Sequence, residues 1–159
     1  MRMVHRAGIF VPDNAYFLFK DGLINGITWS GNYTGYASYQ ITDHIYVRTY
    51  IWSGVSSDND NNASVITQHL DLRGFKRVHF KYTSIHYENG EAPNIRVYPN
   101  YVSLDHEGEG PWTVSYDLSA LADPSDVMLM IQSGHLKKAT TSGSIEASIT
   151  VKEVWVTRD

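Results

Sequence analysis

The chain has 159 residues, a length that suits a single domain spanning residues 1–159. Its formal net charge is −4, from 13 Lys and Arg against 17 Asp and Glu, which argues against nucleic acid and anionic membranes as partners. It has no Cys, which excludes disulfides, thiolate metal sites and Cys nucleophiles, and its apolar runs are far too short to cross a membrane.

The first residues, MRMVHRAGIFVPDN, lack the apolar stretch and the cleavage site of a signal peptide, and residues 1–15 are expected to form an N-terminal arm. Strand-like runs follow at Tyr16–Phe19 and Gly35–Ile41. Around the second run, four aromatic residues stand among Gly, Ser and Asn: Trp29, Tyr33, Tyr36 and Tyr39. This mixture is typical both of adaptable binding loops and of an ordinary β-hairpin, and both alternatives stay open.

The segment from residue 44 to residue 52, HIYVRTYIW, is the most informative part of the sequence. It alternates with the period of a β-strand, which places Ile45, Val47 and Ile51 on one face. The opposite face carries His44, Tyr46, Arg48, Tyr50 and Trp52. A slip of one residue would exchange the two faces, so the direction of the aromatic side chains depends on the register.

The remaining chain continues in short strand-like runs separated by Gly, Asn, Asp, Ser and Pro. The run Asp58–Asn62 is expected to be a polar loop, and Leu118–Leu121 gives one helical turn at most before Pro124. Further strands are expected at Val65–Leu70, Lys76–His86, Ile95–Tyr101, Trp112–Leu118, Val127–Gln132 and Ile145–Thr157. Short strands at this density predict an all-β chain that folds as an antiparallel two-sheet β-sandwich of jelly-roll type.

Three segments resemble strands of jelly-roll, galactose-binding-like carbohydrate-binding domains: LDLRGFKRVHFKY (70–82), WTVSYDLSAL (112–121) and ASITVKEVWV (147–156). The segment YFLFKDGLINGITWS (16–30) is similar to the start of β-sandwich modules in bacteriophage and prophage tail proteins, although it has one Gly before Ile27 where that family usually has two. The resemblance implies a jelly roll of a phage tail that grasps a host cell-wall sugar, in a family whose members are often oligomeric.

The outward face of residues 44–52 has the side chains that carbohydrate recognition needs. Sugar rings stack on flat aromatic faces, and their hydroxyls pair with fork-like donors such as Arg. Arg96, with Tyr98 and Asn100, is expected to add a second such face from a neighbouring strand. The predicted ligand-binding residues are Tyr46, Arg48, Tyr50, Trp52, Tyr98 and Asn100. The alternative is that these rings belong to the packing of the sandwich or to an oligomer interface.

Two polar segments contain side chains that could form a chemical site. Asp58-x-Asp60-x-Asn62 offers the first oxygen ligands of a calcium loop, but Ala63 and His69 stand where an EF-hand requires Gly and a carboxylate. No cofactor is therefore expected, and the alternatives for this run are a solvated turn and a structural calcium site completed by a distant carboxylate. Asp105–Glu109 gathers three carboxylates and one His in a Gly-rich loop, which favours a solvated loop over a catalytic pair.

The sequence therefore predicts a non-enzymatic module that binds cell-surface or cell-wall carbohydrate, as part of a phage or prophage tail, and that acts in the virion or outside the cell. Other tail proteins and further copies of the chain are its expected protein partners. The first alternative is a purely structural tail component without sugar binding. The second is a binding module appended to a glycoside hydrolase.

Overall fold

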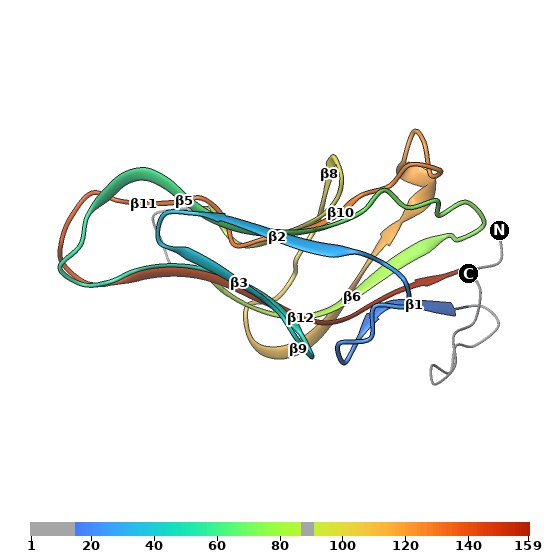
Figure 1. Cartoon of the computed structure of the whole chain (residues 1–159), viewed down its shortest axis with the longest axis horizontal. Helices are drawn as coiled ribbons and strands as arrows, with labels where there is room; N and C mark the ends of the chain where they lie inside the picture. Colours follow the sequence, from blue (N-terminus) through green and yellow to red (C-terminus); the bar gives the residue numbers. More distant parts are fainter. Residues whose placement is uncertain (1–14, 87–90) are drawn as a thin grey trace.

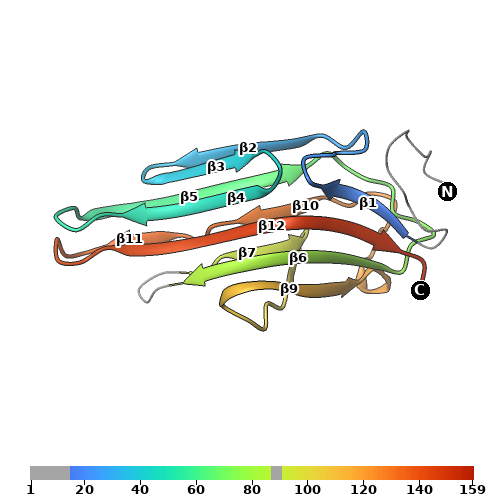
Figure 2. The same cartoon turned by 90° about the horizontal axis from the view of Figure 1, so that it is seen from below.

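The computed structural model describes residues 15–86 and 91–159, and it confirms the all-β class. Two antiparallel sheets pack face to face as a sandwich of jelly-roll type, seen edge-on in Figure 1 and from below in Figure 2. The predicted N-terminal arm lies outside the described residues, apart from Ala15. Within the described ranges no helix is long and apolar enough to span a bilayer.

The lower layer in Figure 1 is sheet A, in which β3, β4, β12, β6 and β9 are neighbours in that order and β1 pairs with the end of β12. Its strands are β1 (Ala15–Lys20), β3 (Ala37–Ile41), β4 (Ile45–Ile51), β6 (Arg77–His86), β9 (Gly108–Asp117) and β12 (Ile145–Thr157). The long β12 runs through the middle of this sheet, between β4 and β6.

The upper layer is sheet B, in which β5 pairs with β2 on one side and with β10 and β11 on the other, and β7 and β8 continue beyond β10. Its strands are β2 (Trp29–Thr34), β5 (Ser57–Thr67), β7 (Asn94–Val97), β8 (Asn100–Val102), β10 (Leu129–Gln132) and β11 (Leu136–Lys138). The helical hint in the sequence is a single 3₁₀ turn, Leu118–Ala120, after β9.

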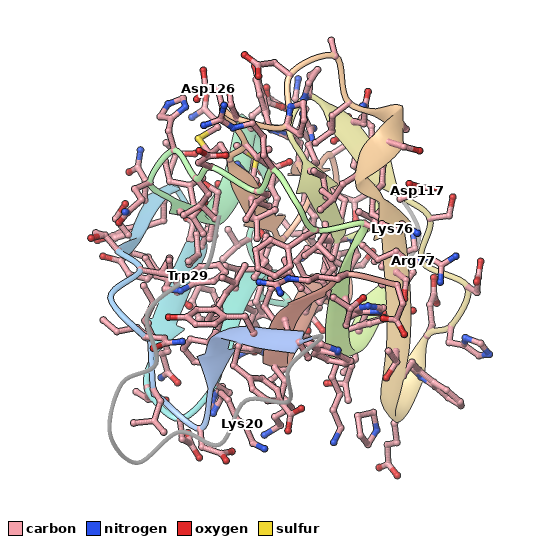
Figure 3. The ribbon with its side chains drawn as sticks, turned by 90° about the vertical axis from the view of Figure 1, so that its right-hand side faces the viewer. Lys20, Trp29, Lys76, Arg77, Asp117 and Asp126 are labelled. Carbon is pink, nitrogen blue, oxygen red and sulfur yellow. The ribbon has the colours of Figure 1, made fainter. Side chains whose placement is uncertain are left out.

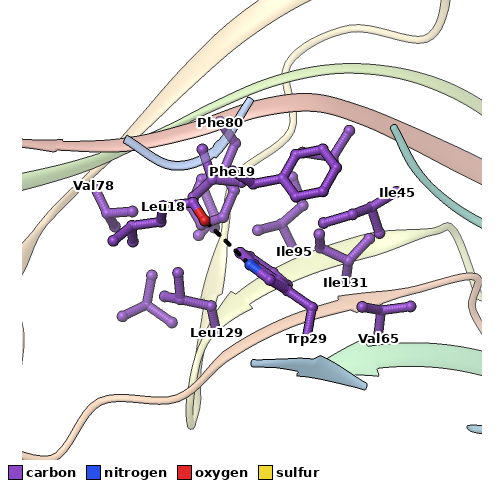
Figure 4. Packing of buried hydrophobic residues seen from close by; sticks show 14 of the residues in the cluster. Leu18, Phe19, Trp29, Ile45, Val65, Val78, Phe80, Ile95, Leu129 and Ile131 are labelled. Carbon is purple, nitrogen blue, oxygen red and sulfur yellow. Dashed lines mark hydrogen bonds between the residues drawn. The ribbon is translucent and has the colours of Figure 1, made fainter. Parts of the chain in front are cut away.

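Apolar side chains from both sheets fill the space between the layers, as the alternation of the strands predicts (Figure 4). Trp29 is part of this core: its ring packs edge-on against Phe19 at 5.9 Å, and its indole N–H donates to the Leu18 carbonyl at 3.2 Å. Burial of a complete Val, Leu, Ile or Phe side chain stabilises the folded state by about 1.5–3 kcal/mol. Figure 3 shows Trp29 between the sheets, whereas the charged side chains of Arg77 and Asp117 lie at the surface. Trp29 is therefore a core residue and not part of a binding loop.

The structure corrects the expectation of a polar loop at Asp58–Asn62, because these residues form the first half of β5. Asp58 and Asp60 are exposed, while Asn61 points inward and is buried. The Asn61 amide donates to the Ser57 hydroxyl and to the carbonyls of Asn59 and Leu136. These bonds satisfy a polar side chain where the pattern of a strand would normally place an apolar one.

The two strands on either side of Gly35 do not form the ordinary hairpin that was one alternative for this segment. β2 pairs with β5 in sheet B and β3 pairs with β4 in sheet A, so the turn carries the chain from one layer to the other. Gly35 has a φ of 64°, and a Cβ at this position would overlap with the amide oxygen of Asn61. Glycine is therefore required at the crossing between the layers.

Candidate functional site

The candidate site lies on the outer face of sheet A, around β4. Ile45, Val47 and Ile51 are buried, so Tyr46, Arg48 and Tyr50 point away from the core, as the sequence predicts. β4 pairs with β3 and β12 without a register shift, which excludes the exchange of faces that a bulge would cause. Figure 2 looks onto the strands of this face.

A first groove, here called the Trp52 groove, lies where β3 and β4 meet the turn after β2. It encloses about 330 Å³ and is lined by Gly35, Tyr36, Ala37, Ser38, Arg48, Tyr50 and Trp52. The Trp52 ring is 53% exposed and stands edge-on to two tyrosine rings, at 5.8 Å from Tyr36 and 5.4 Å from Tyr50. The groove therefore presents an exposed Trp ring beside two Tyr rings, and aromatic rings of this kind can stack on a sugar ring.

Buried polar groups hold the walls of the Trp52 groove in place. The Tyr36 amide donates to the side-chain oxygen of Asn61 at 2.9 Å, and the Tyr50 amide donates to the Tyr36 carbonyl at 3.0 Å. The carbonyl of Trp52 accepts a hydrogen bond from the ammonium group of Lys138, which is itself buried. The aromatic side chains thus project from a backbone that is already fixed before a ligand arrives, which lowers the entropy cost of binding.

Arg48 links this groove to the rest of the face. Its guanidinium lies 4.2 Å from the centre of the Tyr50 ring, and its Nε donates to Glu146 Oε1 at 2.8 Å. Glu146 comes from β12, where its register partner is Tyr50. The ion pair and the stacking together hold the guanidinium beside the Tyr50 ring, and the Arg48 side chain remains 37% exposed.

A second groove, here called the Tyr46 groove, lies on the other side of the Arg48–Glu146 pair. It encloses about 450 Å³ and is lined by Tyr46, Thr83, Ser84, Ile85, Gly108, Glu109, Gly110, Glu146, Ser148 and Thr150. Burial raises the pKa of the Tyr46 phenol, so the phenol stays neutral and can donate a hydrogen bond at neutral pH. Hydroxyls, carboxylates and the apolar surface of Ile85 alternate along this groove.

The two grooves form one band across sheet A. Ser38 on β3 is the register partner of Arg48 on β4, Arg48 pairs with Ser148 on β12, and Ser148 pairs with Ile85 on β6. The band ends at Glu109 on β9. Five neighbouring strands about 4.8 Å apart cover roughly 19 Å, which is longer than a single sugar ring.

The structure brings together four of the six predicted ligand-binding residues and separates the other two. Tyr46, Arg48, Tyr50 and Trp52 line the band. Tyr98 and Asn100 lie in sheet B, at the turn between β7 and β8, so the expectation that they sit on a strand neighbouring β4 is wrong. β7 alternates like the strands of sheet A, and a sequence pattern cannot tell which sheet a strand joins.

The residues near Tyr98 have partners of their own. The Asn100 amide donates to the Tyr116 hydroxyl at 2.7 Å, and the Arg96 guanidinium stacks on Tyr101 at 4.0 Å from the ring centre. Arg96 also donates to the side-chain oxygens of Asn94 and Gln132, both at 3.3 Å. This cluster is a separate feature of sheet B and does not extend the band.

Several lining residues had no signal in the sequence. Glu146, Ser148 and Thr150 belong to the last strand, which resembles an ordinary sandwich strand, and their place beside β4 depends on long-range pairing. Glu109 belongs to a segment for which the sequence predicts a solvated loop, and the structure places it on β9, at the end of the Tyr46 groove. Among the residues that the structure describes, no group of three or more His, Asp or Glu side chains could hold a metal ion.

No protein-family model and no curated protein matches the chain. Solved structures that resemble it include the carbohydrate-binding module CtCBM11, at 9% identity and a TM-score of 0.48, covering 91% of this chain and 95% of that one. The K1 cleaved adhesin domain of Lys-gingipain from Porphyromonas gingivalis W83 is similar at 14% identity and a TM-score of 0.39, covering 94% and 93%. The K2 cleaved adhesin domain of Lys-gingipain is similar at 13% identity and a TM-score of 0.38, covering 92% and 91%.

Proposed function

We propose that the protein is a non-catalytic carbohydrate-binding module and that the band across sheet A is its glycan-binding site. The observation that carries this proposal is the Trp52 groove, where a half-exposed Trp ring and two Tyr rings surround a stacked Arg on a rigid strand. Apolar C–H faces of a sugar would stack on the rings, and its hydroxyls would accept from Arg48 or pair with Tyr46, Ser148 and Thr150.

The length of the band favours an oligosaccharide over a monosaccharide. A single ring in the Trp52 groove buries little apolar area, so its affinity is expected to be weak. A chain that continues past Arg48 into the Tyr46 groove gains contacts at several units. Affinity should therefore rise with chain length until the band is filled.

The experiment is a glycan-array and cell-wall binding screen of the purified chain, followed by titration of the best glycan. Trp52→Ala should abolish binding while moving the melting temperature by less than about 3 °C, because the exposed ring contributes little to the core. Its control is Tyr101→Ala in sheet B, which removes a ring of similar exposure, 59%, outside the band. The proposal fails if no glycan binds, or if Trp52→Ala binds as well as the wild type.

The proposed setting is the tail of a bacteriophage or prophage, where the module would contact a host cell wall and other tail proteins. The support for it is the resemblance of residues 16–30 to the start of tail modules. Several copies in one tail would give avidity through effective concentration, even with weak single sites. The solution mass of the chain, alone and with candidate tail proteins, tests whether it assembles in this way.

The same aromatic cluster favours one alternative function. Tyr36 and Trp52 are both exposed, with their rings 5.8 Å apart, and aromatic clusters of this kind also occur at protein interfaces. In a purely structural tail component, this cluster would be covered by a second subunit. This alternative would be favoured if the wild type forms a stable oligomer that binds no glycan, and if the Trp52→Ala variant no longer forms that oligomer.

A further inference from the structure

We infer that the Arg48–Glu146 ion pair makes the site selective for uncharged glycans over acidic ones, with Glu146 as the specificity-determining residue. This inference rests on the proposed function, since it concerns the ligand of the same band. It follows from three features of the band: which lining residues are charged, how Glu146 is buried, and which cations stand nearby.

The charges along the band do not favour an anion. Among the described residues that line the two grooves, Arg48 is the only basic side chain, and Glu109 and Glu146 are both acidic. The site therefore carries one net negative charge. An acidic sugar would bring a further carboxylate into it, and like charges at short range repel each other.

Arg48 is not free to compensate for that repulsion. Its Nε is bonded to Glu146 Oε1 at 2.8 Å, and the Glu146 side chain is only 15% exposed. Moving the guanidinium onto a ligand carboxylate would leave Glu146 mostly buried without its partner, which is costly. The N–H groups that Glu146 does not use are open to a hydroxyl and to a carboxylate alike, but only the carboxylate brings a like charge close to Glu146.

Another cation on this face, Lys81, does not change the net charge of the site. Lys81 on β6 lies 4.0 Å from Glu153 on β12, and it lines neither groove. No other described basic side chain lines either groove, so Arg48, which is already paired with Glu146, supplies the positive charge of the band. The residue that selects for uncharged chains, Glu146, therefore lies on β12 and not on β4.

The test uses the neutral glycan that binds best and the same glycan after oxidation of its C6 hydroxyls to carboxylates. The wild type should bind the oxidised chain at least about tenfold more weakly, because the added charge enters a partly desolvated site that already holds two carboxylates and one guanidinium. Glu146→Gln keeps the side-chain shape but frees the charge of Arg48, so the difference should fall to about twofold or less. Raising the salt from about 0.05 M to about 0.5 M should narrow the difference in the wild type.

Glu109→Gln is the matched control, since it removes one negative charge from the band without unpairing Arg48. It should retain most of the discrimination against the oxidised chain. Equal binding of both chains by the wild type would overturn the inference, as would equal effects of Glu109→Gln and Glu146→Gln. In either case the proposed function would stand, because the neutral glycan still binds. Failure of the wild type to bind any glycan would instead overturn the proposed function and this inference together.

Discussion

The hydroxyl groups of Thr49 and Ser133 lie 2.7 Å apart in the interior of the sandwich and join its two layers. Thr49 comes from β4, between the two outward residues Arg48 and Tyr50, and Ser133 directly follows β10 in sheet B. The Ser133 hydroxyl also accepts from the Ala63 amide at 2.9 Å. The strand that carries the aromatic site is therefore anchored to the opposite sheet by a buried polar contact.

Thr49→Val should destabilise the fold by about 1–3 kcal/mol, because it leaves the buried Ser133 hydroxyl without this partner while preserving side-chain shape. Urea unfolding monitored by tryptophan fluorescence measures the change. Thr113→Val, on the exposed face of β9, is the control and should change stability by less than about 0.5 kcal/mol. Equal stabilities of Thr49→Val and Thr113→Val would show that the contact between the layers contributes nothing.

Asn61→Ala should weaken both the fold and the binding site. The side chain is buried and supports Ser57, Asn59 and Leu136, and its oxygen accepts from the Tyr36 amide in the wall of the Trp52 groove. Several buried groups lose their partner at once, so a loss of about 2–4 kcal/mol is expected.

The effect of Asn61→Ala on binding separates a positioning role from a purely structural one. Glycan affinity should fall at a temperature where the variant is still fully folded, because Tyr36 is then free to move. Asn59→Ala, which keeps the backbone carbonyl that Asn61 uses, should leave affinity and stability close to the wild type. Unchanged affinity in folded Asn61→Ala would mean that Tyr36 needs no positioning.

Local alternation within residues 44–52 was enough to predict the strand that the structure has at Ile45–Ile51, and the direction of its side chains. The inward positions are Ile, Val and Thr. Because these residues are buried, the side chains between them, Tyr46, Arg48 and Tyr50, must point outward. The same rule failed at Asp58–Asn62. Here the inward residue is Asn61, whose amide bonds to one hydroxyl and two carbonyls. In the sequence such an Asn cannot be told from a loop residue. Those partners are created by the fold and have no local signature.

The sequence also could not show which of the two sheets each strand joins. Trp112–Leu118 and Ile95–Tyr101 are equally plausible as neighbours of β4, yet the first lies in sheet A and the second in sheet B. Pairings between segments distant in the chain decide which residues complete the site. Glu146 stands 98 positions from Arg48, and only the pairing of β12 with β4 brings the two together.

Acid should destabilise the fold through His79. Burial, reinforced by the charge of Arg77, lowers the pKa of His79 below its usual 6.5. The ring stacks on Trp155 at 5.0 Å and hydrogen-bonds to the hydroxyls of Ser115 and Thr157. Since the unfolded chain takes up this proton at a higher pH than the folded one, stability should decline as the pH falls below 6.5 and level off below the folded pKa.

His79→Gln removes this titration, so it should lose less stability than the wild type between about pH 7.5 and about pH 5.5. Contributions from other groups are common to the two proteins and cancel in the comparison. Urea unfolding at both pH values gives the difference. A variant that loses as much stability as the wild type over this interval would show that His79 does not drive the change.

Tyr98 and Asn100 provide a test of which sheet binds the ligand. Both were predicted from the sequence as ligand-binding residues, and both lie in sheet B, away from the band. Tyr98→Ala should leave affinity for the glycan within about twofold of the wild type, because no ligand in the band contacts it. Asn100→Ala should also leave binding unchanged, while losing the hydrogen bond to Tyr116. If Tyr98→Ala abolishes binding and Trp52→Ala does not, the glycan binds sheet B around the Arg96–Tyr101 stack, and the band on sheet A is not the site.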